Sequence, residues 1–489
     1  MSIDQGTTGS AVLILDQGGR LVSSADCNFK QIYPQPGWVE HDPHEIWKSI
    51  EVSAKAALKK INAKPTDILT IGITNQRETV IAWRKSNSEI LHNAIVWQCR
   101  RTSDMCEKLK PKWQKKIQHK TGLVLDPYFS GSKIRWLIEN IKSVQTALKE
   151  NDLAFGTIDT FILWKLTNGK SFCTDVSNAS RTMLMSLKTL AWDDELLKLF
   201  KVSKNCLPEI KPSAGFFGHT ENISFIENKT TITGVAGDQQ SALFGQACFK
   251  PGDSKCTFGT GSFILMNTGE KILRSKSKML TTMAWQIQNE KPIYALEGGA
   301  FICGAAVQWL RDGLGLFENS GDIEKLAASV DDSNGVEFVP ALTGLGAPHW
   351  SATARGEITG LTRGVTKAHI ARATLEAMAL QNADILLSMQ KDLKQKIKSV
   401  KVDGGASQNN LLMQIQSDYL QIQVVRPKEI ETTGMGAAYL AGVGAGIWKN
   451  TSEIQKIWQK DQEFTPKISK KKLALRLKKW NRAVEKAKS

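Results

Sequence analysis

Cysteine is scarce in this chain, and its spacing indicates neither a metal centre nor a disulfide framework. The 489 residues contain 8 cysteines, and no two of them form a C-x-x-C pair. Zinc sites and disulfide-stapled domains need close, repeated cysteines. The sequence therefore excludes a zinc protein of ordinary design and a cysteine-rich secreted domain.

Long apolar segments are also missing. Although 41% of the residues are hydrophobic, no run approaches the ~18 apolar residues that a membrane-spanning helix requires. The N-terminus lacks the charged segment and apolar core of a secretory signal. We therefore expect a globular protein with no integral membrane association, located in the cytoplasm.

Two widespread designs for handling phosphate are absent as well. The chain contains no G-x-x-x-x-G-K-[ST] loop, and it has no H-R-D segment followed by D-F-G. These motifs mark P-loop nucleotide-binding proteins and protein kinases. Any phosphate chemistry in this protein must use another fold.

Positive charge is in excess, with a formal net charge of +16. Part of it lies in residues 467–489, where Leu473, Leu477, Trp480 and Val484 recur at helical spacing between lysines and arginines. This pattern predicts a C-terminal amphipathic helix with a basic outer face. No basic strand interleaved with aromatic residues is present, so attraction of anionic substrates explains the charge better than a nucleic-acid partner.

Two glycine- and threonine-rich turns stand out, about half a chain apart. The first is Asp4-Gln5-Gly6-Thr7-Thr8-Gly9, and the second is Phe258-Gly259-Thr260-Gly261-Ser262. Each lies between two segments with strand character. Small-residue turns expose backbone N–H groups and hydroxyls that suit phosphate oxygens. Singly, each is an ordinary hairpin, but as a pair they predict two related domains that share a phosphate ligand.

The chain is too long for one core, and strands alternate with helices in both halves, so we predict an α/β protein of two domains. The segment Lys250-Pro251-Gly252-Asp253 is the best candidate for the hinge between them. Strands are expected at 68–74, 79–83, 230–236 and 399–402, and helices at 42–58, 158–166, 239–245, 300–313, 368–391, 407–420 and 434–446.

The segment Asn75-Gln76-Arg77-Glu78 is expected to be the turn between paired strands 68–74 and 79–83. Neighbouring residues of a regular strand point to opposite faces, whereas Arg77 and Glu78 in a turn can reach the same ligand. One donates and the other accepts hydrogen bonds, which suits a small polyol with adjacent hydroxyls. The alternative is a solvated surface ion pair.

Several segments together resemble the FGGY family of carbohydrate kinases, and the resemblance covers essentially the whole chain. Residues 128–140 fit the family's first diagnostic pattern, and residues 356–376 fit the second. Residues 72–79 are similar to the members that act on glycerol. Three shorter segments agree, namely Gly37-Trp38-Val39-Glu40, Trp97-Gln98-Cys99-Arg100-Arg101 and Asn178-Ala179-Ser180-Arg181-Thr182.

The resemblance implies two actin-like (ribonuclease H-like) domains with an interdomain cleft. Residues 1–249 would form the glycerol and phosphate side, and residues 254–489 the ATP side, ending in the basic helix. It implies ATP-dependent phosphorylation of glycerol to sn-glycerol 3-phosphate in glycerol catabolism, and a homo-oligomer, either a dimer or a tetramer.

The resemblance also implies residue roles. Asp238 would be the general base and Asp4 would orient Mg²⁺ through water. Glycerol would be bound by Arg77, Glu78, Trp97, Tyr128, Asp238, Gln239 and Phe263. ATP would be bound by Thr7, Thr8, Gly9, Thr260, Gly261, Gly304, Gln308, Gly405 and Asn409.

Two alternatives stay open. The substrate could be another polyol or a ketose. Alternatively, the protein could bind nucleotide without catalysing a reaction and use its basic tail as an interaction surface. Ala11 motivates the latter, because most members carry an arginine there. For Asp238 the alternative role is a helix N-cap, and for Trp97 and Phe263 it is core packing.

Overall fold

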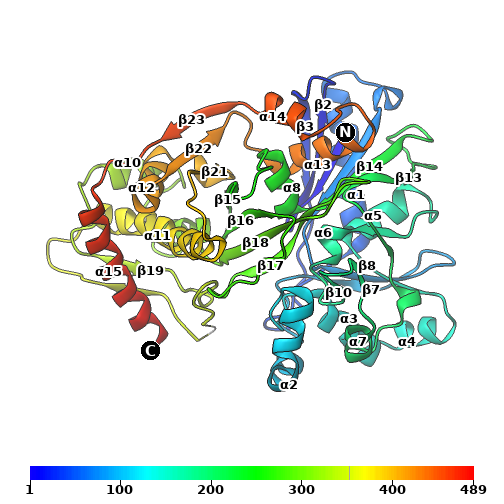
Figure 1. The fold of residues 1–489 in the computed structure, drawn as a ribbon, viewed down its shortest axis with the longest axis horizontal. Helices are drawn as coiled ribbons and strands as arrows, with labels where there is room; N and C mark the ends of the chain where they lie inside the picture. The colour runs from blue at the N-terminus through cyan, green and yellow to red at the C-terminus, as the bar shows by residue number, and fades with distance from the viewer. Residues whose placement is uncertain (352) are drawn as a thin grey trace.

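The computed structural model describes residues 1–351 and 353–489, and it consists of two halves, each built on a large mixed β-sheet flanked by helices (Figure 1). The first half, blue to green, lies on the right of the picture. The second half, green to red, lies on the left, apart from an orange helix that packs on the first half. The expected α/β architecture is confirmed.

The first half contains a six-stranded sheet with the order β13-β14-β5-β1-β2-β3. Its strands are β1 (Ser2–Gln5), β2 (Gly9–Leu15), β3 (Leu21–Asn28), β5 (Thr70–Asn75), β13 (Ala214–His219) and β14 (Thr231–Gly237). The hairpin β1–β2 is antiparallel, and β1 pairs in parallel with β5 on its other side. The central position of β1 brings the first glycine-threonine turn to the carboxyl ends of β5 and β14.

The second half repeats this design in a seven-stranded sheet with the order β17-β18-β16-β15-β21-β22-β23. Its strands are β15 (Ser254–Phe258), β16 (Ser262–Gly269), β17 (Leu280–Trp285), β18 (Ile293–Ala300), β21 (Ser399–Asp403), β22 (Gln423–Pro427) and β23 (Lys460–Phe464). The hairpin β15–β16 is antiparallel and β15 pairs in parallel with β21. The two predicted hairpins therefore occupy equivalent positions in two related sheets.

A four-stranded sheet in the first half corrects one prediction. Strands β5 and β6 do not pair, because β6 belongs to a separate sheet with the order β4-β7-β6-β8. Its strands are β4 (Glu40–His41), β6 (Val80–Arg84), β7 (Ile90–Ile95) and β8 (Leu153–Thr157). Residues 76–79 are therefore a link between two sheets and not a hairpin turn.

Helices cover these sheets. Those of the first half are α1 (Pro43–Lys60), α2 (Ser103–Thr121), α3 (Ser130–Asn140), α4 (Lys142–Lys149), α5 (Ile158–Leu166), α6 (Val176–Ala179), α7 (Asp194–Phe200) and α8 (Asp238–Gly245). Those of the second half are α9 (Gly304–Asp312), α10 (Asp322–Ala328), α11 (Lys367–Leu393), α12 (Asn410–Leu420), α13 (Thr432–Gly444), α14 (Thr451–Ile457) and α15 (Lys470–Lys488). Two-stranded pairs complete the chain: β9 (Cys173–Asp175) with β12 (Glu209–Lys211), β10 (Met185–Ser186) with β11 (Ala191–Trp192), and β19 (Glu337–Val339) with β20 (Glu357–Thr359).

The glycine-rich helix α13 returns from the second half to the first and packs on its sheet, as Figure 1 shows in orange. A Cβ atom added at Gly72 would lie 2.1 Å from the Ala437 carbonyl oxygen, and one at Gly436 would lie 1.8 Å from that of Ser241. In each contact, the missing Cβ of the glycine is what allows the two backbones to approach this closely. The helix expected at 434–446 is observed as α13, and its small residues allow this close packing.

The basic C-terminal helix α15 is part of the fold. Trp480 and Val484 are buried in the core of the second half, and Trp480 Nε1 donates to Asp384 at 2.7 Å. Arg476 pairs with Glu337 and Glu376. Among the described helices, none combines the length and apolarity needed to cross a bilayer.

Candidate active site

The link from β5 to β6 is the centre of the site. Glu78 has a φ of +63°, in the left-handed region that a non-glycine residue rarely adopts. The Thr79 N–H donates to the Arg77 carbonyl at 2.8 Å and closes the bend. The bend directs Arg77 toward Glu297 of the second half and Glu78 toward Arg181, and both side chains are buried. Backbone strain of this kind is concentrated at functional sites.

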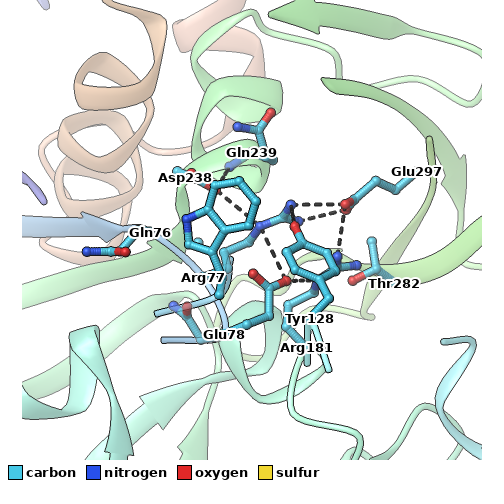
Figure 2. Close-up of polar contacts among 12 residues, drawn as sticks. Gln76, Arg77, Glu78, Tyr128, Arg181, Asp238, Gln239, Thr282 and Glu297 are labelled. Atoms are coloured by element: carbon cyan, nitrogen blue, oxygen red, sulfur yellow. Dashed lines mark hydrogen bonds and ion pairs between the residues drawn. The ribbon is translucent and has the colours of Figure 1, made fainter. Parts of the chain in front are cut away.

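Arg77 is engaged on every side (Figure 2). Its Nη1 donates to Glu297 Oε2 at 2.7 Å and its Nη2 to Glu297 Oε1 at 2.9 Å. Gln240 Oε1 accepts from Nη1 at 3.2 Å, and the Tyr128 hydroxyl from Nη2 at 3.4 Å. Nε lies 3.1 Å from Asp238 Oδ1. The guanidinium is thereby fixed in one orientation between the two halves.

A second buried arginine, Arg181, completes the charge network. Its Nε donates to Glu78 Oε1 at 2.6 Å and its Nη2 to Glu297 Oε1 at 2.9 Å. Within the described residues, no hydrogen bond is donated to the other carboxylate oxygens, Glu78 Oε2 and Asp238 Oδ2. These two oxygens are free to accept hydroxyl groups of a ligand.

Electrostatics in this network follow from burial and pairing. Burial opposes ionisation of Glu297, but Arg181 and Arg77 outweigh it and lower the pKa of its carboxyl to about 2. Burial raises the pKa of Glu78 despite the two arginines. Burial opposes the Arg77 cation, yet Glu297 and Glu78 hold its pKa well above the usual value. Glu297 is thus firmly anionic.

Asp238 begins helix α8 at the end of β14. The N-cap position belongs to Gly237, and Asp238 is the first helical residue, so the N-cap alternative does not hold. Its side chain is 30% exposed, which leaves the carboxylate accessible. The first turn of a helix favours a negative charge there. Position, exposure and a free oxygen suit a group that accepts a proton.

Gln239 is directed elsewhere. Its Oε1 accepts a hydrogen bond from the buried Lys255 Nζ, which also donates to the Thr257 hydroxyl at 2.8 Å. Figure 2 shows the Gln239 amide turned away from Arg77 and Glu78. The contacts of this side chain link α8 to strand β15, and its role in substrate binding stays a prediction.

Three aromatic rings gather beside the charged network. The ring centroids of Trp97 and Tyr128 are 5.6 Å apart, and those of Trp97 and Phe263 are 6.4 Å apart, both edge-on. Phe263 comes from the second half. The buried Lys133 donates to the Tyr128 carbonyl at 2.5 Å, which holds the Tyr128 loop. Together the rings form an apolar wall drawn from both halves.

The first glycine-threonine turn joins this wall. Gly6 N–H donates to the Gly9 carbonyl at 2.9 Å, which closes the turn between β1 and β2. Thr8 is exposed at its tip. Trp97 Nε1 donates to the Thr7 hydroxyl at 3.0 Å. The predicted phosphate residues Thr7, Thr8 and Gly9 therefore adjoin the predicted substrate residues.

The second turn rests on the start of helix α9. Gly259 N–H donates to the Gly261 carbonyl at 2.9 Å, while Gly304 N–H donates to the Gly259 carbonyl at 2.9 Å. Thr260 is exposed, and Gln308 lies one turn further along α9, also exposed. Thr260, Gly261, Gly304 and Gln308 thus share one region, although the helix expected at 300–313 begins only at Gly304.

The last predicted nucleotide residues lie at the neighbouring strand end. Gly405 follows β21, whose end is beside that of β15, and it is exposed with open space around its Cα. Asn409 is the N-cap of α12 and accepts from the Leu412 N–H at 2.8 Å. The helix expected at 407–420 starts at Asn410, after a short 3₁₀ turn.

Asp4, on β1, is the predicted magnesium residue. Burial, together with the charges of Asp238 and Glu431, raises the pKa of its carboxyl to about 8. The Asp4 side chain has no hydrogen bond or ion pair in the described part of the chain, and no three His, Cys, Asp or Glu residues there are grouped as a closed metal site. An unpaired carboxyl near other carboxyls fits a cation held with few protein ligands and several waters.

Arg181 and Glu297 belong to the site, although the sequence alone assigned no role to either residue. Arg181 lies in the Asn178–Thr182 segment that carries the family resemblance, but its partner Glu78 is 103 residues away. Glu297 interrupts the apolar strand 293–300, and a charge in a buried strand is itself a signal. Strand periodicity alone could not tell which partner would neutralise it.

Two halves of one design, with a small-residue turn in each and a buried network of charged, hydroxyl-binding groups that joins them, define a phosphotransferase for a polyhydroxy substrate. Comparisons with known proteins agree. The model of the FGGY family of carbohydrate kinases, N-terminal domain, matches residues 1–245, and that of the C-terminal domain matches residues 254–445. The chain belongs to the FGGY family of carbohydrate kinases, and its two domains have the actin-like fold of that family.

Three individual relatives show which kinases of the family this chain is similar to. A glycerol kinase of Bdellovibrio bacteriovorus is 60% identical over 486 residues, covering 99% of this chain and 98% of that protein. The crystal structure of Plasmodium falciparum glycerol kinase with ADP has a TM-score of 0.92 at 37% identity, covering 99% and 97% of the two chains. A ligand-bound xylulose kinase from Lactobacillus acidophilus has a TM-score of 0.86 at 25% identity, covering 99% and 97%.

Proposed function

We propose that this protein catalyses the ATP-dependent phosphorylation of glycerol to sn-glycerol 3-phosphate. The observation that carries the proposal is the pair of free carboxylate oxygens on Glu78 and Asp238, held beside Arg77 and Tyr128. Glycerol is small and uncharged, so hydrogen bonds to its hydroxyls must provide most of the binding. The 60% identity to a protein named glycerol kinase supports the same substrate.

In this proposal Glu78 accepts a hydroxyl that does not react, while the aromatic wall of Trp97 and Phe263 contacts the carbon chain. Asp238 accepts the hydrogen of the terminal hydroxyl that attacks the γ-phosphate. Aspartate is a weak base, with an ordinary pKa of about 3.9. In a loose phosphoryl-transfer transition state its larger contribution is to orient the attacking oxygen.

ATP is the phosphoryl donor, with its phosphates between the two glycine-threonine turns. Thr7, Thr8 and Gly9 serve from the first half, and Thr260 and Gly261 from the second. The adenosine part lies toward Gly304, Gln308, Gly405 and Asn409. Mg²⁺ supplies charge neutralisation when it is bound, and the unpaired carboxyl of Asp4 holds it through water.

The domain assignment belongs to the same proposal. Residues 1–249 carry the glycerol and phosphate side, and residues 254–489 carry the ATP side. The segment 250–253 lies between α8 and β15, directly before β15, with Gly252 at a φ of +93°. A hinge there would let the halves close on the substrates and expel water, which otherwise competes with glycerol for the γ-phosphate.

A coupled ADP-release assay with purified protein tests the proposal. Glycerol should give saturable turnover that requires both ATP and Mg²⁺. A panel with xylulose, gluconate and other polyols separates glycerol from the alternative substrates, because a ketose or sugar acid must fit the same two carboxylates. Turnover with glycerol no faster than with the other compounds, or no faster than background, would refute the assignment.

A further inference from the structure

Glu297 is the single charged residue of strand β18 and is 2% exposed. It comes from the second half of the chain, whereas the proposed glycerol-binding charges Arg77, Glu78 and Asp238 come from the first half. Burying a carboxylate is costly unless ionic partners compensate for it. Its contacts therefore decide what this charge does at the boundary between the halves.

One carboxylate holds two arginines (Figure 2). Both terminal nitrogens of Arg77 bind Glu297, at 2.7 and 2.9 Å, in the bidentate geometry that fixes a guanidinium most firmly. Arg181 Nη2 reaches the same Oε1 at 2.9 Å. Both terminal nitrogens of Arg77 and the Nη2 of Arg181 are therefore held by Glu297, while Arg181 Nη1 is buried and has no hydrogen-bond partner among the described residues.

The Nε of each arginine meets one carboxylate of the proposed substrate site. Arg77 Nε lies 3.1 Å from Asp238 Oδ1, and Arg181 Nε lies 2.6 Å from Glu78 Oε1. Each carboxylate thus gives one oxygen to an arginine and keeps the other for a ligand. Without Glu297, both guanidiniums would be short of a counter-charge, and Asp238 and Glu78 are the nearest carboxylates that could take up the freed N–H groups.

We propose that Glu297 is a positioning residue for the acceptor substrate: by holding Arg77 and Arg181 from the second half, it keeps one oxygen of Asp238 and one of Glu78 free for substrate hydroxyls. This inference rests on the proposed function. The proposed role differs from that of a purely structural ion pair, because loss of Glu297 would change which carboxylate oxygens of Asp238 and Glu78 are free for the substrate.

The test compares Glu297→Gln and Glu297→Asp with a matched control, Glu376→Gln. Glu376 is also a buried carboxylate shared by two arginines, Arg372 at 3.0 Å and Arg476 at 3.0 Å, but it lies on α11. For each variant we would measure KM for glycerol, KM for ATP, kcat and the unfolding temperature. The control should lower the unfolding temperature and leave both KM values within about twofold of the wild type.

For Glu297→Gln we expect KM for glycerol to rise about 100-fold while KM for ATP changes less than about threefold, because truncating one partner of a buried charge pair typically has an effect of this size. Glu297→Asp keeps the charge but shortens the reach, and an intermediate rise of about tenfold is expected. If Glu297→Gln does not fold, Glu297→Asp decides the question by the same comparison of the two KM values.

A variant with a lowered unfolding temperature but unchanged KM for glycerol would overturn the inference, as would equal increases in both KM values. These outcomes require a wild-type enzyme that turns over glycerol. Absence of wild-type turnover would instead refute the proposed function, and the assignment of Glu297 would be refuted with it. The two failures are therefore distinguished by the wild-type measurement alone.

Discussion

Replacing Asp238 with asparagine separates chemistry from structure in this site. The substitution keeps the size of the side chain and removes its charge and its ability to accept a proton. Arg77, which lies 3.1 Å from Asp238, keeps its two bonds to Glu297 at 2.7 and 2.9 Å. The arginine therefore stays in position when the Asp238 charge is lost.

Stability should hardly change. The Asp238 side chain is 30% exposed, and ion pairs that reach solvent contribute about 0–1 kcal/mol. We therefore expect the free energy of unfolding of Asp238→Asn to stay within about 1 kcal/mol of the wild type. ATP affinity should also be preserved, since the proposed nucleotide residues lie on the two turns and on the second half.

Turnover should fall sharply. A positioned general base contributes about 10²- to 10⁴-fold to a rate. A loss near 10³-fold in kcat corresponds to about 4 kcal/mol of transition-state stabilisation at ~1.4 kcal/mol per decade. The loose transition state of phosphoryl transfer argues against a still larger effect.

The assay is glycerol-dependent ADP release at saturating ATP, with nucleotide affinity measured by calorimetry. Asp193→Asn is the control, because Asp193 also lies at the start of a helix, where it caps α7 and pairs with Lys120. The control should retain full kcat. A folded Asp238→Asn enzyme with kcat within about tenfold of the wild type would refute the role of Asp238 as base.

Three further outcomes test the fold and its charges. Gly436→Ala should lower the free energy of unfolding by about 3 kcal/mol, because its Cβ would lie 1.8 Å from a backbone oxygen of α8. The control Gly321→Ala has open space around its Cβ and should change the free energy of unfolding by no more than about 0.5 kcal/mol. Equal denaturant midpoints for the two variants would contradict this expectation. Trp480→Ala should lower the free energy of unfolding by about 3–5 kcal/mol and leave the KM values unchanged. Substitution of its exposed neighbour, Lys479→Ala, should leave the unfolding temperature unchanged. If Trp480→Ala also left stability unchanged, the basic helix would be an appended tail and not part of the fold. The pKa of Glu297 is lowered from 4.5 to about 2, so its ionisation stabilises the fold above about pH 4.5, and this contribution, on the order of 3 kcal/mol, is lost as the pH falls toward 2. In an acid titration, Glu297→Gln should therefore lose stability less steeply than the wild type over that pH range. An unchanged slope would contradict the pairing of Glu297 with the two arginines.

Local secondary structure and turns could be predicted from the sequence. The helix predicted at 158–166 is observed as α5 with the same bounds, and the two glycine-threonine turns are hairpins in equivalent positions. The helix expected at 434–446 is observed as α13 (Thr432–Gly444). Such features depend on side-chain periodicity and on the conformational freedom of a few residues, both of which are local properties.

The tertiary structure alone decided which of these elements meet. Strands β5 and β6 are adjacent in sequence yet belong to different sheets, and Gln239 binds Lys255 instead of facing Arg77. The decisive contact, Arg77 with Glu297, joins residues 220 positions apart. By itself the sequence determined the two halves, their turns and the chemistry each residue could perform. The sheet order and the packing between halves decided which charges neutralise one another, because a buried charge is matched by spatial neighbours that local patterns do not encode.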